Sequence, residues 1–346
     1  MKYARQLFNK RSFRTNEIEY EQEQAYNCQG YSHISQKQAP LTDTASSLNS
    51  YPHSVDDHPT NAVFRVLRTG PRTSLQDAGR RGMKWIGMPP GGAMDLGILE
   101  RLNRLFDQHP HTAALEMLWA GLQLECLSDV WIAYGGAAKA FLERDPIDAE
   151  HTIFVRYGQT LRFQADDSGL WSYLVLAGGW HGKSWYQSLS VWPEKGIGKS
   201  LEDHDLLFAA SSDRWNPPRG IAARFSKPQD PPEDCSIRVY PGPQWREFSE
   251  SSKHHFFEIS WEISMQISRA GYRLKGGKIE TPSRQLISEP TLVGSIQIPP
   301  DGQPIVLLND GPTIGGYHKI AMIHRDDLDR FRQMPPGQHV NFSLIS

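Results

Sequence analysis

The segment from Gly294 to Ile320 constrains the fold most strongly, because short apolar runs alternate there with strong turn signals. Residues Ser295–Ile298 and Ile305–Leu308 are typical of buried strands. Between them, Pro299-Pro300-Asp301-Gly302 indicates a tight turn, since proline presets φ and glycine tolerates a positive φ. The sequence therefore predicts a hairpin, followed by a third strand from Tyr317 to Ile323.

Polar residues gather at the predicted strand ends of this segment. Gly315 and Gly316 let the backbone turn tightly before the third strand. Donors and acceptors on such corners predict the rim of a small-ligand site, and the alternative is that they only satisfy turn backbone. The residues concerned are Gln297, Asp301, Gln303, Asn309, Asp310, Thr313, Tyr317 and Lys319.

Glycine and proline are spread along the whole chain. The 29 glycines and 24 prolines interrupt long helices and favour many short strands. A chain of 346 residues suits about two domains, each long enough to bury a core. We therefore predict a mainly β protein with few short helices.

The net charge, the cysteines and the lack of long apolar runs argue against several kinds of partner and site. The formal net charge of −2 gives no reason to expect a nucleic-acid or membrane-surface partner. Three widely separated cysteines predict neither a disulfide framework nor a metal site, and they fit a reducing cytoplasm. No apolar run reaches the roughly 20 residues that span a bilayer.

Two segments divide the chain. Residues 1–61 are polar, with few aliphatic side chains, and predict a disordered or loosely attached arm. The first fourteen residues are basic. This faintly suggests an organelle presequence, but an ordinary polar tail is the favoured interpretation. Prolines cluster in residues 212–234. We therefore predict a first domain over 62–225 and a second over 226–346.

A long glycine-rich connection from Gly70 to Asp95 is the second candidate region. Loops of this length in compact domains are usually functional or disordered, and the apolar residues within it favour order. Arg80 could clamp a carboxylate or phosphate, or it could form an ion pair with Asp77 or Asp95. Asp95 is also a predicted helix N-cap, followed by an apolar face. The site candidates here are Gln76, Asp77, Arg80 and Asp95.

Glu116 interrupts an otherwise apolar run from Ala114 to Leu118. A buried carboxylate needs a partner that compensates its charge. Glu116 is therefore either a site residue or one half of a structural pair.

Several of these motifs occur together in a known family. The chain resembles the biotin-dependent carboxyltransferase, or allophanate hydrolase subunit two, family, which includes the C subunit of bacterial 5-oxoprolinase and the regulator KipA. The resemblance covers residues 63–345. It rests on 75–82 (LQDAGRRG), 87–95 (GMPPGGAMD), 113–116 (AALE), 177–179 (AGG), 241–244 (PGPQ), 271–274 (GYRL) and most of 294–320.

The resemblance implies a fold, an activity and partners. It implies two cyclophilin-like β-barrel domains and association with a B-type sister subunit and an A-type subunit. The implied activity is the ATP-dependent opening of 5-oxoproline to glutamate. The alternatives are a KipA-like regulator that counteracts a kinase inhibitor, and a carboxyltransferase module for a urea-like acceptor. The chain contains no biotin-acceptor motif and no glycine loop for ATP, so either group would come from another chain.

The implied chemistry concerns a small amide or lactam. Such a site needs donors for the amide oxygen, acceptors for its N–H and a cation for developing negative charge. We predict catalytic roles for Asp77, Arg80, Asp310 and Lys319, and no metal. The loops of Arg80 and Asp310 are expected to converge where the two barrels pack. Predicted substrate-binding residues are Gln76, Asp95, Glu116, Gln297, Asp301, Gln303, Thr313, Gly315, Gly316 and Tyr317.

Overall fold

The computed structural model describes residues 62–166, 168–211 and 236–345, all within one compact unit. The predicted arm and the proline-rich segment at the predicted domain boundary lie outside the described residues, so the domain boundaries stay a prediction. None of the helices in these ranges is long and apolar enough to cross a membrane.

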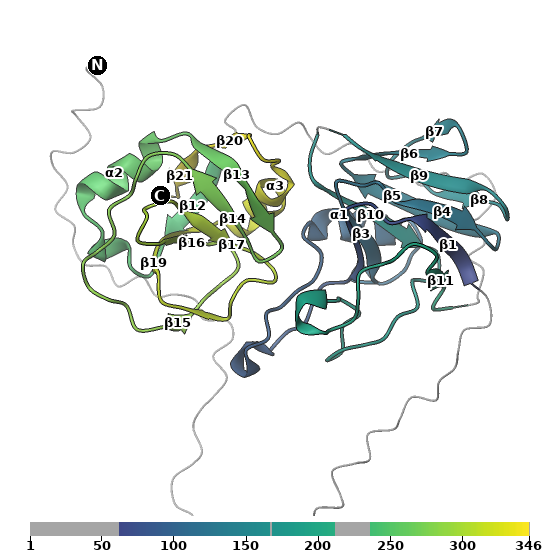
Figure 1. Ribbon diagram of the computed structural model, residues 1–346, viewed down its shortest axis with the longest axis horizontal. Helices are drawn as coiled ribbons and strands as arrows, with labels where there is room; N and C mark the ends of the chain where they lie inside the picture. Colours follow the sequence, from purple (N-terminus) through teal and green to yellow (C-terminus); the bar gives the residue numbers. More distant parts are fainter. Residues whose placement is uncertain (1–61, 167, 212–235, 346) are drawn as a thin grey trace, which may run out of the picture. The chain divides into compact units, whose positions relative to one another are not determined.

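We call residues 62–211 the first β region. Its strands are β1 (Ala62–Arg68), β2 (Arg72–Gln76), β3 (Ala114–Leu118), β4 (Gln123–Cys126), β5 (Val130–Gly136), β6 (Ala138–Leu142), β7 (Asp145–Ile147), β8 (Ile153–Val155), β9 (Thr160–Ala165), β10 (Trp171–Leu176) and β11 (Leu206–Phe208). They form a six-stranded sheet, β11-β1-β4-β9-β6-β7, and a five-stranded sheet, β2-β3-β10-β5-β8 (Figure 1). All six side chains of the central strand β10 are buried.

We call residues 236–345 the second β region. Its strands are β12 (Ile237–Pro241), β13 (Trp261–Ser268), β14 (Gly271–Lys275), β15 (Glu289–Pro290), β16 (Ser295–Ile298), β17 (Ile305–Leu307), β18 (Ile314–Gly315), β19 (His318–Ile323), β20 (His339–Val340) and β21 (Phe342–Leu344). Eight form one sheet in the order β20-β13-β14-β17-β16-β19-β12-β21, and β15 pairs with β18. One residue separates the edge strands β20 and β21, so the sheet is a nearly closed barrel.

Helices are short and few among the described residues, so the predicted mainly β fold class is confirmed. The α-helices are α1 (Leu96–Arg104), α2 (Glu250–Glu258) and α3 (Leu328–Gln333). The 3₁₀ helices are η1 (Lys84–Ile86), η2 (Pro193–Lys195), η3 (Trp245–Glu247) and η4 (Arg325–Asp327).

Local chemistry accounts for the elements that matter most for the site. The side chain of Asp95 accepts a hydrogen bond from Ile98 N at 3.0 Å, which confirms the predicted N-cap of α1. The predicted hairpin is present as β16 and β17, and its turn closes with Gly302 N donating to Pro299 O at 2.9 Å. Gly302 has a φ of 78°, as the turn chemistry requires.

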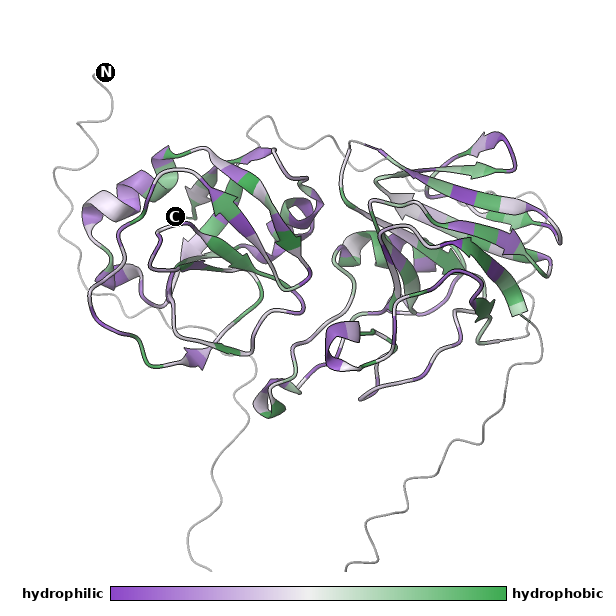
Figure 2. Ribbon diagram, in the orientation of Figure 1, coloured by the Kyte–Doolittle hydropathy of each residue, from purple (hydrophilic) through white to green (hydrophobic). Residues whose placement is uncertain are grey.

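Apolar packing joins α1 to both β regions. Hydrophobic and hydrophilic residues alternate along the strands of the six-stranded sheet (Figure 2), whose inner face packs into one core cluster. A second cluster contains Leu99 and Leu102 of α1, Trp171 of β10, and residues of the second region such as Ile263 and Phe331. The two regions therefore share a hydrophobic core, which fixes the loops between them.

Candidate functional site

The loop before α1 folds back on the strand end that carries Asp77. Arg80 N donates to Pro90 O at 2.6 Å, and Ala93 N donates to Asp77 O at 2.7 Å. Gly92 has a φ of +85°, and a Cβ there would lie 2.8 Å from the Ala78 carbonyl carbon. Only glycine fits this close approach between two backbone segments.

The second β region holds the same loop by hydrogen bonds. Gly91 N donates to Asn309 O at 3.0 Å, and Asn309 Nδ2 donates to the carbonyls of Gly92 and Ala93 at 3.1 and 2.9 Å. A Cβ built on Gly91 would lie 2.9 Å from Arg80 Nη1 and 3.7 Å from Asp310 Oδ1. The loops of Arg80 and Asp310 thus meet around Gly91.

Arg269 lies at the centre of this junction with a side chain that is 1% exposed. Its Nε and Nη2 donate to the two carboxylate oxygens of Asp310 at 2.7 and 3.1 Å, and its Nη1 donates to Glu116. Burial by itself lowers the pKa of Arg269, but the carboxylates of Glu116 and Asp310 outweigh it and raise the pKa above its ordinary value. We call Arg269, Glu116 and Asp310 the buried triad.

Glu116 ties the triad to the N-terminal end of α1. Its Oε2 accepts hydrogen bonds from Met94 N at 2.7 Å and from the Tyr173 hydroxyl at 2.8 Å. Burial, reinforced by the negative charge of Glu116, raises the pKa of Tyr173 well above its ordinary value. Of the two alternatives that the sequence left open, the structural pair is therefore present.

Arg80 and Asp77 both bind residues 185–190. Arg80 is 3% exposed and donates to the carbonyls of Trp185 and Ser190. Asp77 accepts hydrogen bonds from the Ser188 hydroxyl at 2.7 Å and the Ser190 hydroxyl at 2.6 Å. Burial lowers the pKa of Arg80, although the negative charges of Asp77 and Asp310 oppose the shift. Within the described residues Arg80 forms no ion pair, so neither partner that the sequence offered, Asp77 or Asp95, binds it.

A second polar cluster surrounds Lys319, which is 1% exposed. Lys319 Nζ donates to Glu289 Oε1 at 2.6 Å, and Gln244 Nε2 donates to the same oxygen at 2.8 Å. Burial raises the pKa of Glu289, but these two hydrogen bonds outweigh it and leave the pKa lowered. Gln297 Nε2 is buried without a partner among the described residues, and a Cβ on Gly315 would lie 2.8 Å from it.

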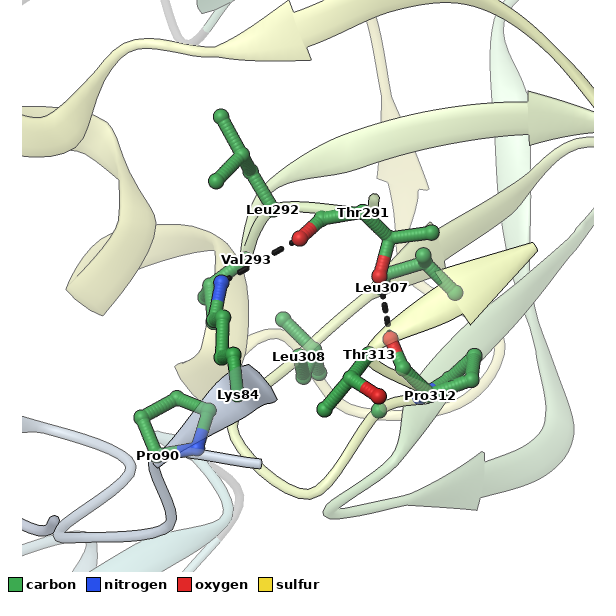
Figure 3. Close-up of a pocket in the computed structure, with 10 residues that line it drawn as sticks. Lys84, Pro90, Thr291, Leu292, Val293, Leu307, Leu308, Pro312 and Thr313 are labelled. Atoms are coloured by element: carbon green, nitrogen blue, oxygen red, sulfur yellow. Dashed lines mark hydrogen bonds between the residues drawn. The ribbon is translucent and has the colours of Figure 1, made fainter. Parts of the chain in front are cut away.

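A pocket lies beside the Asp310 loop (Figure 3). It is small, with room for about one water molecule, and is open to solvent. Lys84 of η1 projects along one side, and its Nζ donates to Thr291 O at 3.2 Å. The lining residues are Lys84, Pro90, Thr291, Leu292, Val293, Leu307, Leu308, Gly311, Pro312 and Thr313.

The family follows from comparison with known proteins. Residues 86–344 match the family model for the carboxyltransferase domain, subdomains A and B. The chain belongs to this family. It is 33% identical to the C subunit of 5-oxoprolinase from Escherichia coli K12 over 294 residues, which cover 82% of this chain and 92% of the relative. It is 28% identical to urea amidolyase of Lachancea kluyveri, of which it covers 17%.

Solved structures of similar fold include two longer chains. The protein TTHA0988 has a TM-score of 0.73 and 28% identity, and this chain spans 57% of its length. Kluyveromyces lactis urea carboxylase has a TM-score of 0.72 and 26% identity, with 28% of its length covered. This carboxyltransferase-domain chain thus corresponds to part of each of these proteins and to nearly the whole of the E. coli relative.

The carboxyltransferase fold brings most predicted site residues into two groups. Gln76, Asp77, Arg80, Asp95, Glu116 and Asp310 lie in or next to the buried junction, while Gln297, Gly315, Gly316, Tyr317 and Lys319 surround the second cluster. Thr313 lines the pocket. Asp301 and Gln303 belong to the hairpin turn that precedes β17, whereas Asp310 follows β17. Asp301 pairs with Arg273 and Gln303 binds the backbone of Gly276, so this turn is separate from both groups.

Gly315 and Gly316 also serve a different purpose from the one predicted. Neither has a positive φ, so the backbone does not need glycine there for a left-handed turn. A Cβ on Gly315 would instead meet the end of the Gln297 side chain at 2.8 Å, so a larger residue would displace that side chain.

Three charged residues of these sites were absent from the sequence-based set: Lys84, Arg269 and Glu289. The buried carboxylate of Glu116 signalled that a cation was needed. However, its partner Arg269 is 153 residues away in the chain. No local pattern distinguishes Arg269 or Lys84 from the other basic residues of the sequence.

Proposed function

We propose that this chain is the C-type subunit of a cytoplasmic, ATP-dependent 5-oxoprolinase. In this proposal it acts with a B-type sister subunit and an A-type subunit that open 5-oxoproline to glutamate. The observation that carries the proposal is the match to the 5-oxoprolinase C subunit of E. coli over 92% of that protein. A 30% identical relative of the same name from Haemophilus influenzae, also 92% covered, supports it.

The match to the 5-oxoprolinase C subunits supports a small cyclic amide as the ligand. Amide resonance makes a lactam a poor electrophile, so a site must supply donors for its oxygen and a positive charge for negative charge that develops. Lys84 supplies a cation at the pocket wall, and the Lys319 cluster adjoins Thr291 of the same pocket through Gly315. Asp77, Arg80 and Asp310 each bind internal partners, so we assign them the role of positioning residues.

The test is reconstitution with the A-type and B-type subunits from the same organism. We expect 5-oxoproline to stimulate ATP hydrolysis and glutamate to appear in equal amount. The variants Asp77→Asn and Lys319→Ala should each lower this activity. A sizing column shows whether each variant complex still assembles, so that loss of activity is not loss of assembly. Full activity in both variants and in Arg80→Ala would exclude this site as the active site.

A second candidate is a carboxyltransferase module that receives biotin from another chain. The matches to urea amidolyase and to the urea carboxylase structure favour it. In this case a carboxybiotin-bearing carrier should transfer its carboxyl group to urea only when the chain is present. No biotin or ATP site is assigned to this chain in either proposal.

A further inference from the structure

Helix α3 of the second β region binds the first β region through one glutamine. Gln333 Oε1 accepts hydrogen bonds from Leu170 N at 3.1 Å and from Trp171 N at 2.9 Å. Gln333 Nε2 donates to Trp171 O at 3.1 Å and to Asp95 Oδ2 at 2.9 Å. A side-chain amide has two donor and two acceptor sites, so every site of Gln333 is used across the boundary between the two regions. We call these four hydrogen bonds the Gln333 contact.

Two carboxylates, one from each β region, share the N-terminal end of α1 beside this contact. Asp95 Oδ1 accepts from Ile98 N at 3.0 Å, and Asp329 Oδ2 of α3 accepts from Gly97 N at 3.0 Å. The unpaired backbone N–H groups at the start of a helix favour negative charge there. Asp95 is buried, whereas Asp329 is partly exposed. The charge of Asp95 is therefore the more strongly shielded from water.

No basic side chain of the described residues forms an ion pair with Asp95. Arg101 of α1 binds Glu150 at 2.8 Å, and Arg332 of α3 binds Asp329 at 2.8 Å. The buried triad beyond them has two carboxylates for one cation. An ionised Asp95 thus adds negative charge to surroundings that are already negative. The charged and titratable groups around it are Arg101, Glu150, Asp329, Arg332, Tyr173, Glu116, Arg269 and Asp310.

We infer that the Gln333 contact is a pH-sensitive latch between the two β regions, which holds most tightly when Asp95 is protonated. In the closed latch an ionised Asp95 is desolvated and faces the negative charge of Asp329 across the boundary. Opening lets water solvate both carboxylates, so it favours the ionised form. Burial, together with the charge of Asp329, raises the pKa of Asp95 to about 6. The closed state binds the proton more tightly than the open state, so its stability is lost as pH rises through 6.

The latch is next to the buried triad. Met94 N donates to Glu116 Oε2 at 2.7 Å, and Asp95 N donates to the Tyr173 hydroxyl at 2.7 Å. That hydroxyl donates in turn to Glu116 Oε2 at 2.8 Å. Opening of the latch therefore loosens the start of α1, from which Glu116 receives its support. All of these contacts are internal to the chain, so the latch does not depend on the proposed function.

Hydrogen exchange of the full chain at pH 5.0 and pH 7.5 measures the opening. The backbone amides of Leu170 and Trp171 are the reporters, because both donate to Gln333 Oε1 and lose this acceptor when the latch opens. Phe163 N, which donates to Leu122 O at 2.9 Å, is the reference for global unfolding, since Phe163 is buried in the other core cluster. Each exchange rate is divided by the intrinsic rate at the same pH.

We expect the reporters of the wild type to open more often than Phe163 at both pH values. Their opening should rise about tenfold from pH 5.0 to pH 7.5, as follows from a pKa of about 6 in the closed latch and the ordinary value of 3.8 in the open one. Asp95→Asn keeps a good N-cap and cannot ionise, so its reporters should change less than about twofold. Asp329→Asn removes the facing charge and should show a smaller rise than the wild type. The control Asp145→Asn, exposed on β7, should behave as the wild type.

Three results would overturn the latch. Reporters as well protected as Phe163 would mean that the Gln333 contact opens only by global unfolding. No rise in the wild type, or a tenfold rise that persists in Asp95→Asn, would mean that Asp95 does not control the opening. If Asp95→Asn does not fold, Asp329→Asn decides, and a rise equal to that of the wild type overturns the inference.

Discussion

Arg269 and Lys84 both lie at the loop before α1, but they differ in how far neighbouring carboxylates neutralise their positive charge. Arg269 is 1% exposed and is matched by two carboxylates, Glu116 and Asp310. Lys84 is half-buried and is matched by one backbone carbonyl. A buried charge that is fully paired holds the fold together, whereas one left without a counter-charge has capacity for a ligand. Arg269 therefore belongs to the framework of the junction, whereas Lys84 keeps unused hydrogen-bonding capacity at the pocket.

The largest expected effect is on stability, from Arg269→Met. The substitution leaves the buried carboxylates of Glu116 and Asp310 without a cation, which costs about 3–5 kcal/mol of unfolding free energy. Urea denaturation followed by tryptophan fluorescence measures the loss. The matched control combines Arg269→Met with Glu116→Gln and Asp310→Asn, which should recover part of it. Equal stability of wild type and the single variant would mean that the triad is not structural.

The next effect tests the loop that the triad holds. Gly92→Ala combines a φ of +85° with a Cβ 2.8 Å from backbone atoms, so we expect a loss of about 2–3 kcal/mol. Gly87→Ala is the control, because its φ is +80° and no atom lies within 4 Å of its Cβ. It should cost only about 1 kcal/mol. Thermal unfolding of both variants separates the cost of the close backbone approach at Gly92 from the cost of backbone strain alone. Equal losses of stability in the two variants would contradict the packing argument.

A third effect concerns pH at the start of α1. Burial, together with the negative charge of Asp329, raises the pKa of Asp95 to about 6. Because the folded-state pKa exceeds the unfolded value, the protonated form is favoured by folding, and this stability is lost as pH rises through 6. We expect the wild type to lose on the order of 2 kcal/mol between pH 4 and pH 7 relative to Asp95→Asn. Parallel pH profiles for the two proteins would contradict the assignment.

The smallest expected stability effect is that of Lys84→Met. Its hydrogen bond to Thr291 O contributes about 1 kcal/mol or less, and no carboxylate is left unpaired when the charge is removed. Chemical denaturation should therefore show nearly the wild-type midpoint. A loss as large as that of Arg269→Met would make Lys84 part of the framework and remove the contrast between the two cations.

Local signals predicted the elements that position the site. Strand β16 occupies the predicted residues, Asp95 caps α1, and the turn at Gly302 closes the β16–β17 hairpin. Each of these follows from neighbours in the chain: a short apolar run, a capping side chain, or a glycine that accepts positive φ.

Residues of the candidate site were predicted less completely, for a physical reason. The sequence identified the loops of Arg80 and Asp310, and it identified Glu116 as a carboxylate in need of a partner. It could not distinguish Asp301, which pairs with Arg273 at the far end of the hairpin, from Asp310, which pairs with Arg269. Both aspartates lie at strand ends, and only the surrounding strands decide which one faces the junction.

The amino-acid sequence by itself determined a mainly β chain, its main turns and caps, and its membership of the carboxyltransferase-domain family. These depend on local backbone preferences and on motifs that can be read in order along the chain. The tertiary structure alone decided which cations are compensated. Arg269 and Glu116 are 153 residues apart, and Lys84 and Thr291 are 207 apart, so their pairing depends on how the two β regions pack. Electrostatic compensation acts through space, and the order of residues along the chain does not record it.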